Sequence, residues 1–511
     1  MDKLATDVLV IGAGAAGIRA AIEASMAGVE VTLVADAKPA KGGSTFSGIS
    51  RGWGIQALTG EERTAANLEA FYDDVMRVGL GCCDPRLVRI LVEESGARIQ
   101  DLMSYGLEFK TGANGEPIRA RGCFSEIERA FLTRDIANIR GTFLSILQRV
   151  PVRIVTGYAI DLIVNDGQCL GAWIGLKRGG YLQINAKSTI LATGGGSGIF
   201  KDHMSNEGGC GAGYALAHRA GARITNMEFI QFALGLKNNR TRKFLPIGQL
   251  DQAGKIVNTA GCDILNRYVP DDKQRRLAIE KRQNHMPFSC RDSSGQVDIA
   301  IAQARRSDKH LYWHDGGPKE DRFEVVHFAH AFNGGIKINE EAESTVAGLY
   351  AAGEVAAGTH GADRIGGCMM TATQVFGKRA GHFAARRATQ VGTDAFPPNA
   401  AKLIKSEQPA DRNEDVMEAL AVIEDRVKET MAQYAGVLRT KKGLKKARSI
   451  LDTCQTQLDA LGFIGADASC EYYRVRSMAV TAHLVVQSAL IRGKSMGSHY
   501  RQDDKNYQAN N

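Results

Sequence analysis

The sequence lacks several features that mark particular classes of protein. Its ten cysteines are scattered, with no CxxC pair and no spacing typical of a zinc or iron–sulfur site. No apolar run approaches the roughly 18 residues that a membrane span requires, and the N-terminal residues lack the basic and apolar regions of an export signal. We therefore expect a cytoplasmic protein with reduced thiols, no metal of its own and no segment inserted in a membrane.

The basic residues are in excess, but they form no block. The formal net charge is +8 and the isoelectric point is near 8.9, yet lysines and arginines are interleaved with acids along the chain. Nucleic acid is therefore not an expected partner. An anionic cofactor and a small anionic substrate suit this charge better. At 511 residues the chain is also too long for one core, which predicts two or three domains.

A glycine-rich turn follows the first apolar run, Val8 to Ile11, and opens a helical stretch, Ala16 to Met26. Another apolar run, Val29 to Val34, completes a strand–helix–strand unit. In this context the glycines predict a dinucleotide site, because missing side chains let the backbone approach a pyrophosphate at the helix start. The cofactor-binding candidates here are Gly12, Gly14, Ala15, Ala16 and Gly17, with Asp36 after the last strand as the candidate for a ribose contact.

Two further glycine turns follow apolar strands later in the chain. Thr193 and Gly194 come directly after a strand that ends at Leu191, and Glu354 follows the strand-like run before Gly353. An acid at that point can accept hydrogen bonds from ribityl hydroxyls. Three such turns in this order favour FAD over a nicotinamide cofactor.

Four segments, spanning residues 227–232, 330–339, 360–367 and 492–499, resemble successive signatures of one family. It is the succinate dehydrogenase/fumarate reductase flavoprotein family, which also includes L-aspartate oxidase and the adenylylsulfate reductase alpha subunit. In the last segment Met496 replaces the family's arginine. The resemblance implies an α/β fold: a Rossmann-like FAD-binding domain in two parts (1–231 and 326–397), an inserted α+β capping domain (232–325) and a C-terminal helical domain (398–511).

The resemblance also implies roles for individual residues. Arg364 would bind a substrate carboxylate close to the flavin, and His330 would bond the other end of the substrate. Arg291, within Ser289–Asp292, is the closest match to the family's proton-transferring arginine. Further residues expected at the flavin are Gly43, Ser44, Gly367, Cys368 and Met369. Residues 42–46 contain no histidine like the one that bonds the flavin in respiratory members, so we expect non-covalent FAD.

The chain departs from the family pattern at two places. The dicarboxylate enzymes have His-Pro-Thr, which contacts a substrate carboxylate, where this chain has Ala233-Leu234-Gly235. Succinate and fumarate are therefore not expected as substrates. At the flavin's pyrimidine side, Cys368-Met369-Met370 replaces Asn-Ser-Leu.

Three functions remain open from the sequence. The first is hydride transfer between flavin N5 and a small anionic substrate. The second is amine oxidation of the L-aspartate oxidase kind, and the third is a non-catalytic flavin subunit that only transfers electrons. Each requires a separate electron donor or acceptor, such as an iron–sulfur protein, and the sequence leaves oligomer formation open.

Overall fold

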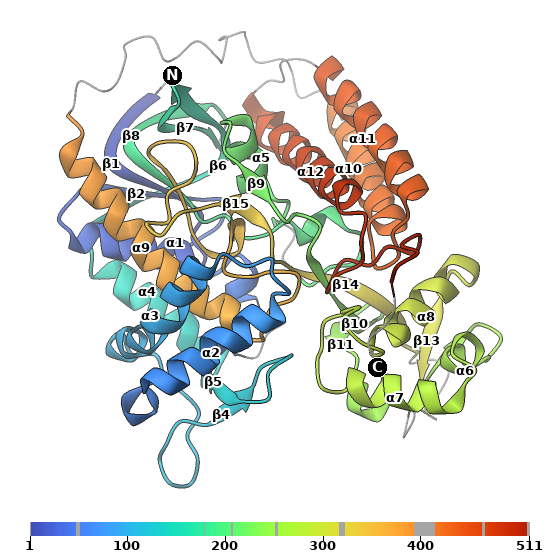
Figure 1. Ribbon diagram of the computed structural model, residues 1–511. Helices are drawn as coiled ribbons and strands as arrows, with labels where there is room; N and C mark the ends of the chain where they lie inside the picture. Colours follow the sequence, from blue (N-terminus) through green and yellow to red (C-terminus); the bar gives the residue numbers. More distant parts are fainter. Residues whose placement is uncertain are drawn as a thin grey trace.

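The computed structural model describes residues 2–47, 52–177, 179–205, 208–250, 254–315, 322–392, 414–461 and 466–507 (Figure 1). Its largest sheet contains five parallel strands in the order β16, β8, β1, β2 and β6, and β7 pairs antiparallel with both β6 and β8. These strands are β1 (Asp2–Ile11), β2 (Val31–Ala35), β6 (Val152–Asn165), β7 (Gln168–Leu176), β8 (Tyr181–Leu191) and β16 (Leu349–Ala351). The predicted strand–helix–strand unit is thus present at the centre of the sheet.

Two helices lie together against this sheet, α1 (Ala15–Met26) and α9 (Cys368–Gln390) (Figure 1). Their close approach depends on glycine, because a Cβ atom added at Gly381 would lie 2.4 Å from the carbonyl oxygen of Ala20. On the other side α9 contacts α3 (Pro85–Ser104). Other elements of this region are α2 (Ala65–Val78), α4 (Ile136–Gln148), α5 (Ala212–Arg219), β3 (Gly54–Gln56), β4 (Arg119–Arg121), β5 (Glu128–Leu132), β9 (Ile224–Thr225), β15 (Gly335–Lys337) and β17 (Ala356–Ala357).

The expected cap has its own sheet and its own apolar core. Five strands pair in the order β11, β10, β14, β13, β12, and a core that includes Leu234, Ile301 and Trp313 packs between this sheet and three helices. The elements are β10 (Ile230–Lys237), β11 (Arg242–Phe244), β12 (Lys255–Asn258), α6 (Ile264–Tyr268), α7 (Asp272–Arg282), α8 (Gly295–Ser307), β13 (Leu311–His314) and β14 (Glu324–Phe332). Strands β10 and β14 cross the predicted limits at 231/232 and 325/326, which stay predictions.

Three long helices form the C-terminal part, α10 (Glu414–Tyr434), α11 (Lys441–Leu461) and α12 (Ala466–Ile491). The boundary predicted between 397 and 398 lies outside the described residues. Beyond α12 the chain returns to the other two parts: the N–H of Cys290 donates to the carbonyl of Gly497 at 2.8 Å, and the N–H of Ser498 donates to that of Ala362 at 3.1 Å. Within the described residues no helix is long and apolar enough to cross a membrane.

Candidate active site

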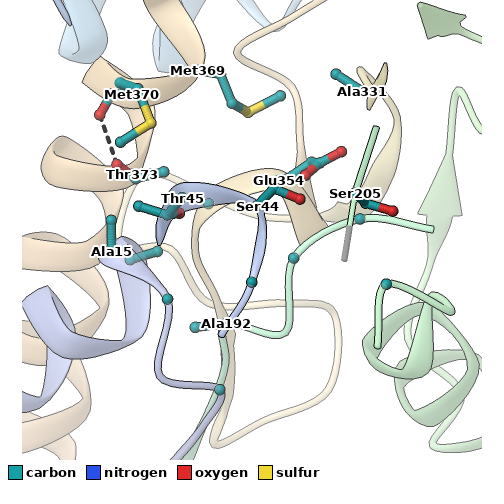
Figure 2. Close-up of a pocket in the computed structure, with 18 of the residues that line it drawn as sticks. Ala15, Ser44, Thr45, Ala192, Ser205, Ala331, Glu354, Met369, Met370 and Thr373 are labelled. Atoms are coloured by element: carbon teal, nitrogen blue, oxygen red, sulfur yellow. Dashed lines mark hydrogen bonds between the residues drawn. The ribbon is translucent and has the colours of Figure 1, made fainter. Parts of the chain in front are cut away.

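The three glycine turns meet around one cavity of about 390 Å³ (Figure 2). Figure 2 shows Ala15, Ser44, Ala192 and Glu354 around this hollow, with Met369 on its far side. The residues predicted from the sequence that line it are Gly12, Gly14, Ala15, Ala16, Asp36, Gly43, Ser44, Thr193, Gly194, His330, Glu354, Arg364, Gly367 and Met369. Three predicted residues are not among its lining: Gly17, Cys368 and Arg291.

The first turn requires glycine for two different reasons. Gly12 has φ +109°, and a Cβ atom there would lie 2.3 Å from the carbonyl oxygen of Ala192 in the second turn. A Cβ atom at Gly17 would lie 1.8 Å from the carbonyl oxygen of Gly12. Gly14 is different, because its added Cβ would have only Thr45 Oγ1 near it, at 3.8 Å, and it lines the cavity. Gly17 therefore shapes the turn, whereas Gly14 leaves room for a ligand.

The helices that begin at the cavity have no side-chain caps within the described part of the chain. Gly14 precedes α1 and Gly367 precedes α9, and at neither position does a capping side chain accept from the first N–H groups. By contrast Asp84, Asp135 and Asp271 cap α3, α4 and α7. Uncapped helix starts suit an anion or a hydrogen-bond acceptor supplied by a ligand.

Cys368, the first residue of α9, is buried among Leu58, Phe71 and Val75. Its thiol therefore lies in an apolar cluster, and burial raises its pKa to about 12. Met369 and Met370 line the cavity instead, so thioethers replace polar side chains at this helix start.

Buried polar groups at the cavity also fit FAD. Glu354 accepts the N–H of Phe332 at 2.9 Å, and burial raises the pKa of its carboxyl group. The hydroxyl of Thr193 is buried without a hydrogen-bond partner among the described residues, although this residue lines the cavity. Asp36 lies just after β2 at the other end. Hydroxyl-rich and phosphate groups of a dinucleotide would satisfy such positions.

A buried arginine occupies the substrate end. The Arg364 side chain donates from Nε and Nη2 to the Oε1 atom of Gln231, at 3.1 and 2.8 Å, while Nη1 has only the carbonyl of Ile365 at 3.5 Å among the described residues. Burial lowers the pKa of Arg364, but an arginine remains charged at neutral pH. The guanidinium group is thus a fixed cation with part of its edge unused.

Two histidines near Arg364 are neutral at physiological pH. Burial and the arginine's charge lower the pKa of His330 to about 4 and that of His360 to about 3. His330 lines the cavity, and its ring lies against that of Phe244 on β11 with centroids 5.7 Å apart. The Nε2 atom of His360 is buried, and no described residue forms a hydrogen bond with it. These rings supply hydrogen bonds rather than charge.

Arg291 lies beside the site but forms other contacts. Its Nε and Nη2 atoms lie 2.9 and 2.8 Å from Oδ2 of Asp363, Nη2 donates to the carbonyl of Val78 at 2.7 Å, and the guanidinium covers the ring of Phe124. Burial raises the pKa of Asp363 to about 6, and the arginine opposes this shift. The proton-transfer role of Arg291 stays a prediction.

Sequence reasoning missed the residues that complete the substrate end. Gln231 binds Arg364, and Cys123, Met286 and Pro287 line the cavity from the cap side. Gln231 lies within a segment quoted for its family resemblance, which was a usable signal. The other three have no motif, because their positions depend on the cap's placement.

The chain matches known flavoproteins along nearly its whole length. A family model described as the FAD binding domain matches residues 7–370, and one described as fumarate reductase flavoprotein C-term matches residues 424–511. The fumarate reductase (CoM/CoB) of Methanothermobacter marburgensis has a polypeptide that is 30% identical to this chain, covering 97% of this chain and 94% of that protein. The chain belongs to the succinate dehydrogenase/fumarate reductase flavoprotein family. It is an FAD-dependent oxidoreductase.

Other relatives and structures agree with this assignment. L-aspartate oxidase of Halobacterium salinarum is 27% identical over 98% of this chain and 97% of that protein. In fold, a variant of E. coli quinol fumarate reductase matches with a TM-score of 0.78 at 21% identity, covering 100% of this chain and 93% of that chain. The predicted α/β fold with a cap and C-terminal helices is therefore confirmed.

Proposed function

We propose that this flavoprotein transfers hydride between non-covalently held FAD and a small carboxylate, and that the carboxylate is not succinate or fumarate. The observation that carries the proposal is the buried cation of Arg364, which Gln231 fixes at the end of the FAD cavity beside neutral His330. A buried cation with unused N–H groups is a strong site for one anion.

The bound flavin supplies an acceptor or donor of hydride at N5. This chain's own residues do the rest. Arg364 binds and orients the carboxylate, and His330 donates or accepts a hydrogen bond as a neutral ring. We propose that Arg291, beside Asp363, moves a proton. Its present contacts would require a rearrangement of the side chain to reach the cavity.

Electrons must enter or leave through a separate molecule. No group of His, Cys, Asp or Glu suitable for a metal ion occurs among the described residues. We therefore propose a separate redox partner, such as an iron–sulfur protein, and a cytoplasmic location.

Amine oxidation is the second candidate, because the chain is similar to L-aspartate oxidases along nearly its whole length. Hydrogen peroxide released under air with an amino acid as substrate would favour that function over carboxylate chemistry.

The test uses the holoprotein, reduced anaerobically with dithionite and freed of excess reductant. A panel of unsaturated carboxylates is added, and return of the oxidised flavin spectrum is recorded. We expect reoxidation by at least one of them, slowed roughly ten- to hundredfold by Arg364→Ala, because one charge-assisted bond is worth about 1.5–3 kcal/mol.

Arg386→Ala is the matched control, because this arginine is 54% exposed and forms a surface ion pair with Glu341. Its rate should equal that of the original protein. If no carboxylate and no amino acid exchanges electrons with the flavin, the non-catalytic alternative is correct.

A further inference from the structure

The substrate end of the cavity contains one cation. Among the lining residues that the structure describes, the charged side chains are Asp36, Lys38, Glu354 and Arg364. Asp36 and Lys38 follow β2, at the predicted ribose end. Because His330 and His360 are neutral, Arg364 is the one cation of this lining that faces an anion near Gln231.

Arg364 is arranged for a single carboxylate group. The oxygen of Gln231 already occupies the edge formed by Nε and Nη2, at 3.1 and 2.8 Å. The atom left with the weakest contact is Nη1, which lies 3.5 Å from a carbonyl oxygen. The unused N–H groups at Nη1 and Nη2 can therefore bind one carboxylate end-on.

Arg291 does not act as a second cation in this cavity. Its guanidinium is neutralised by Asp363 and is not among the lining residues. A second carboxylate on the substrate would therefore have to find a partner among uncharged groups.

The cap side of the cavity offers apolar and weakly polar atoms instead. Cys123, Met286 and Pro287 line it, and the N–H of Met286 donates to the sulfur of Cys123 at 3.3 Å. Pro287 also forms a backbone bridge with Ala233, where the family resemblance places a carboxylate-binding histidine. This side would leave an ionised group without compensation.

The protein itself fills the position of the family's threonine. A Cβ atom added at Gly235 would lie 2.1 Å from the ring of Phe328. The ring of Phe328 is fully buried, so a polar side chain at 235 would require it to move. The lost carboxylate donors are therefore replaced by packed apolar atoms.

We propose that the substrate is a monocarboxylate with an apolar body, a 2-enoate or its saturated counterpart, which rests on the proposed hydride transfer. Arg364 binds the carboxylate, and Cys123, Met286 and Pro287 face the body. In the reductive direction the β-carbon of the enoate accepts hydride and the α-carbon accepts a proton. The reduced flavin becomes oxidised in that step, and the separate donor supplies both electrons.

Crotonate and fumarate provide the test, because a methyl group in the first replaces a carboxylate in the second on the same skeleton. Each is titrated into the oxidised holoprotein, and binding is followed by the change in flavin absorbance. We expect crotonate to bind at least tenfold more tightly than fumarate. Tighter fumarate binding, equal binding, or no binding of either acid would overturn the inference.

A charge-introducing variant tests the wall itself. Met286→Arg should shift the preference toward fumarate by at least tenfold, since it adds a cation where the second carboxylate would lie. Met417→Arg is the control: Met417 is 43% exposed on α10, so it adds the same charge outside the cavity and should keep the original preference. An unchanged preference in flavin-replete Met286→Arg would contradict the assigned wall.

Binding and turnover are scored separately. Preferential crotonate binding without reoxidation of the reduced flavin by any carboxylate would leave the monoanion site in place and reject the hydride-transfer function. Reoxidation by dicarboxylates alone would keep the function and reject the monocarboxylate.

Discussion

At the scale of single residues, the pairing of Gln231 with Arg364 determines how much positive charge the site presents. Gln231 is fully buried, and its oxygen receives two N–H groups of the guanidinium, while its Nε2 atom has no partner in the described part of the chain. A neutral amide orients the arginine without cancelling its charge. An acid in the same place would orient it equally well and neutralise it.

Gln231→Glu should therefore weaken anion binding at least tenfold while FAD remains bound, because the new carboxylate would compete with the substrate for Arg364. The measurement is the dissociation constant of a binding anion, taken from flavin absorbance, together with the FAD content. Gln249→Glu in the cap, an exposed position, makes the same chemical change elsewhere and should have no effect. Unchanged affinity in Gln231→Glu would show that Arg364 is not the anion's partner.

The sequence predicted the residues at the cofactor better than those at the substrate. Gly12, Gly14 and Glu354 lie in local turns whose chemistry can be read from neighbouring residues. The contact of Gln231 with Arg364 joins positions 133 residues apart, and the placement of Arg291 against Asp363 spans 72. Such contacts depend on how the cap packs on the FAD-binding part, which local patterns do not specify.

At the scale of elements, α1 and α9 differ from the surface helices in how they begin. Both follow a glycine and open at the cavity without a side-chain cap from any described residue, whereas α3 and α7 carry aspartate caps. The first N–H groups of α1 and α9 are thus available to a cofactor. The glycine motif before α1 consequently serves both packing and binding.

Two alanine variants should separate these roles. Gly17→Ala should lower the Tm of the apoprotein, because its Cβ would lie 1.8 Å from the carbonyl oxygen of Gly12. Gly14→Ala should leave the apoprotein's Tm nearly unchanged but weaken FAD binding, since the nearest described atom to its Cβ is 3.8 Å away. Thermal unfolding and FAD titration measure the two effects. Equal losses of apoprotein Tm would contradict the assignment.

At the scale of the whole molecule, three parts of the chain meet around residues 360–364. The segment after α12 contacts both the cap at Cys290 and the FAD-binding part at Ala362. The hydroxyl of Tyr507 also donates to the carbonyl of Cys290 at 3.0 Å. The arginine loop is therefore held by all three parts, and changes in the stability of one will reach the site.

Acid should destabilise this assembly between about pH 6.5 and 5, before ordinary carboxylates titrate. Burial lowers the pKa of His285 and His330 to about 4 and that of His360 to about 3 in the folded protein. The unfolded chain takes up these protons near pH 6.5, so their contribution to stability is complete above that pH and is lost as pH falls. Asp363 acts in the opposite direction, because its folded pKa is raised to about 6.

Three histidines outweigh one aspartate in this range, so the Tm should fall when pH is lowered from 7 to 5. Each fully titrating group changes the free energy of unfolding by about 1.4 kcal/mol per pH unit. Circular dichroism and flavin release would follow the transition. His285→Gln removes one of the titrating groups, whose ring bonds Pro287 and Ser294, and should make the decline shallower. A Tm that stays constant or rises on acidification would show that these histidines do not control the stability of the site.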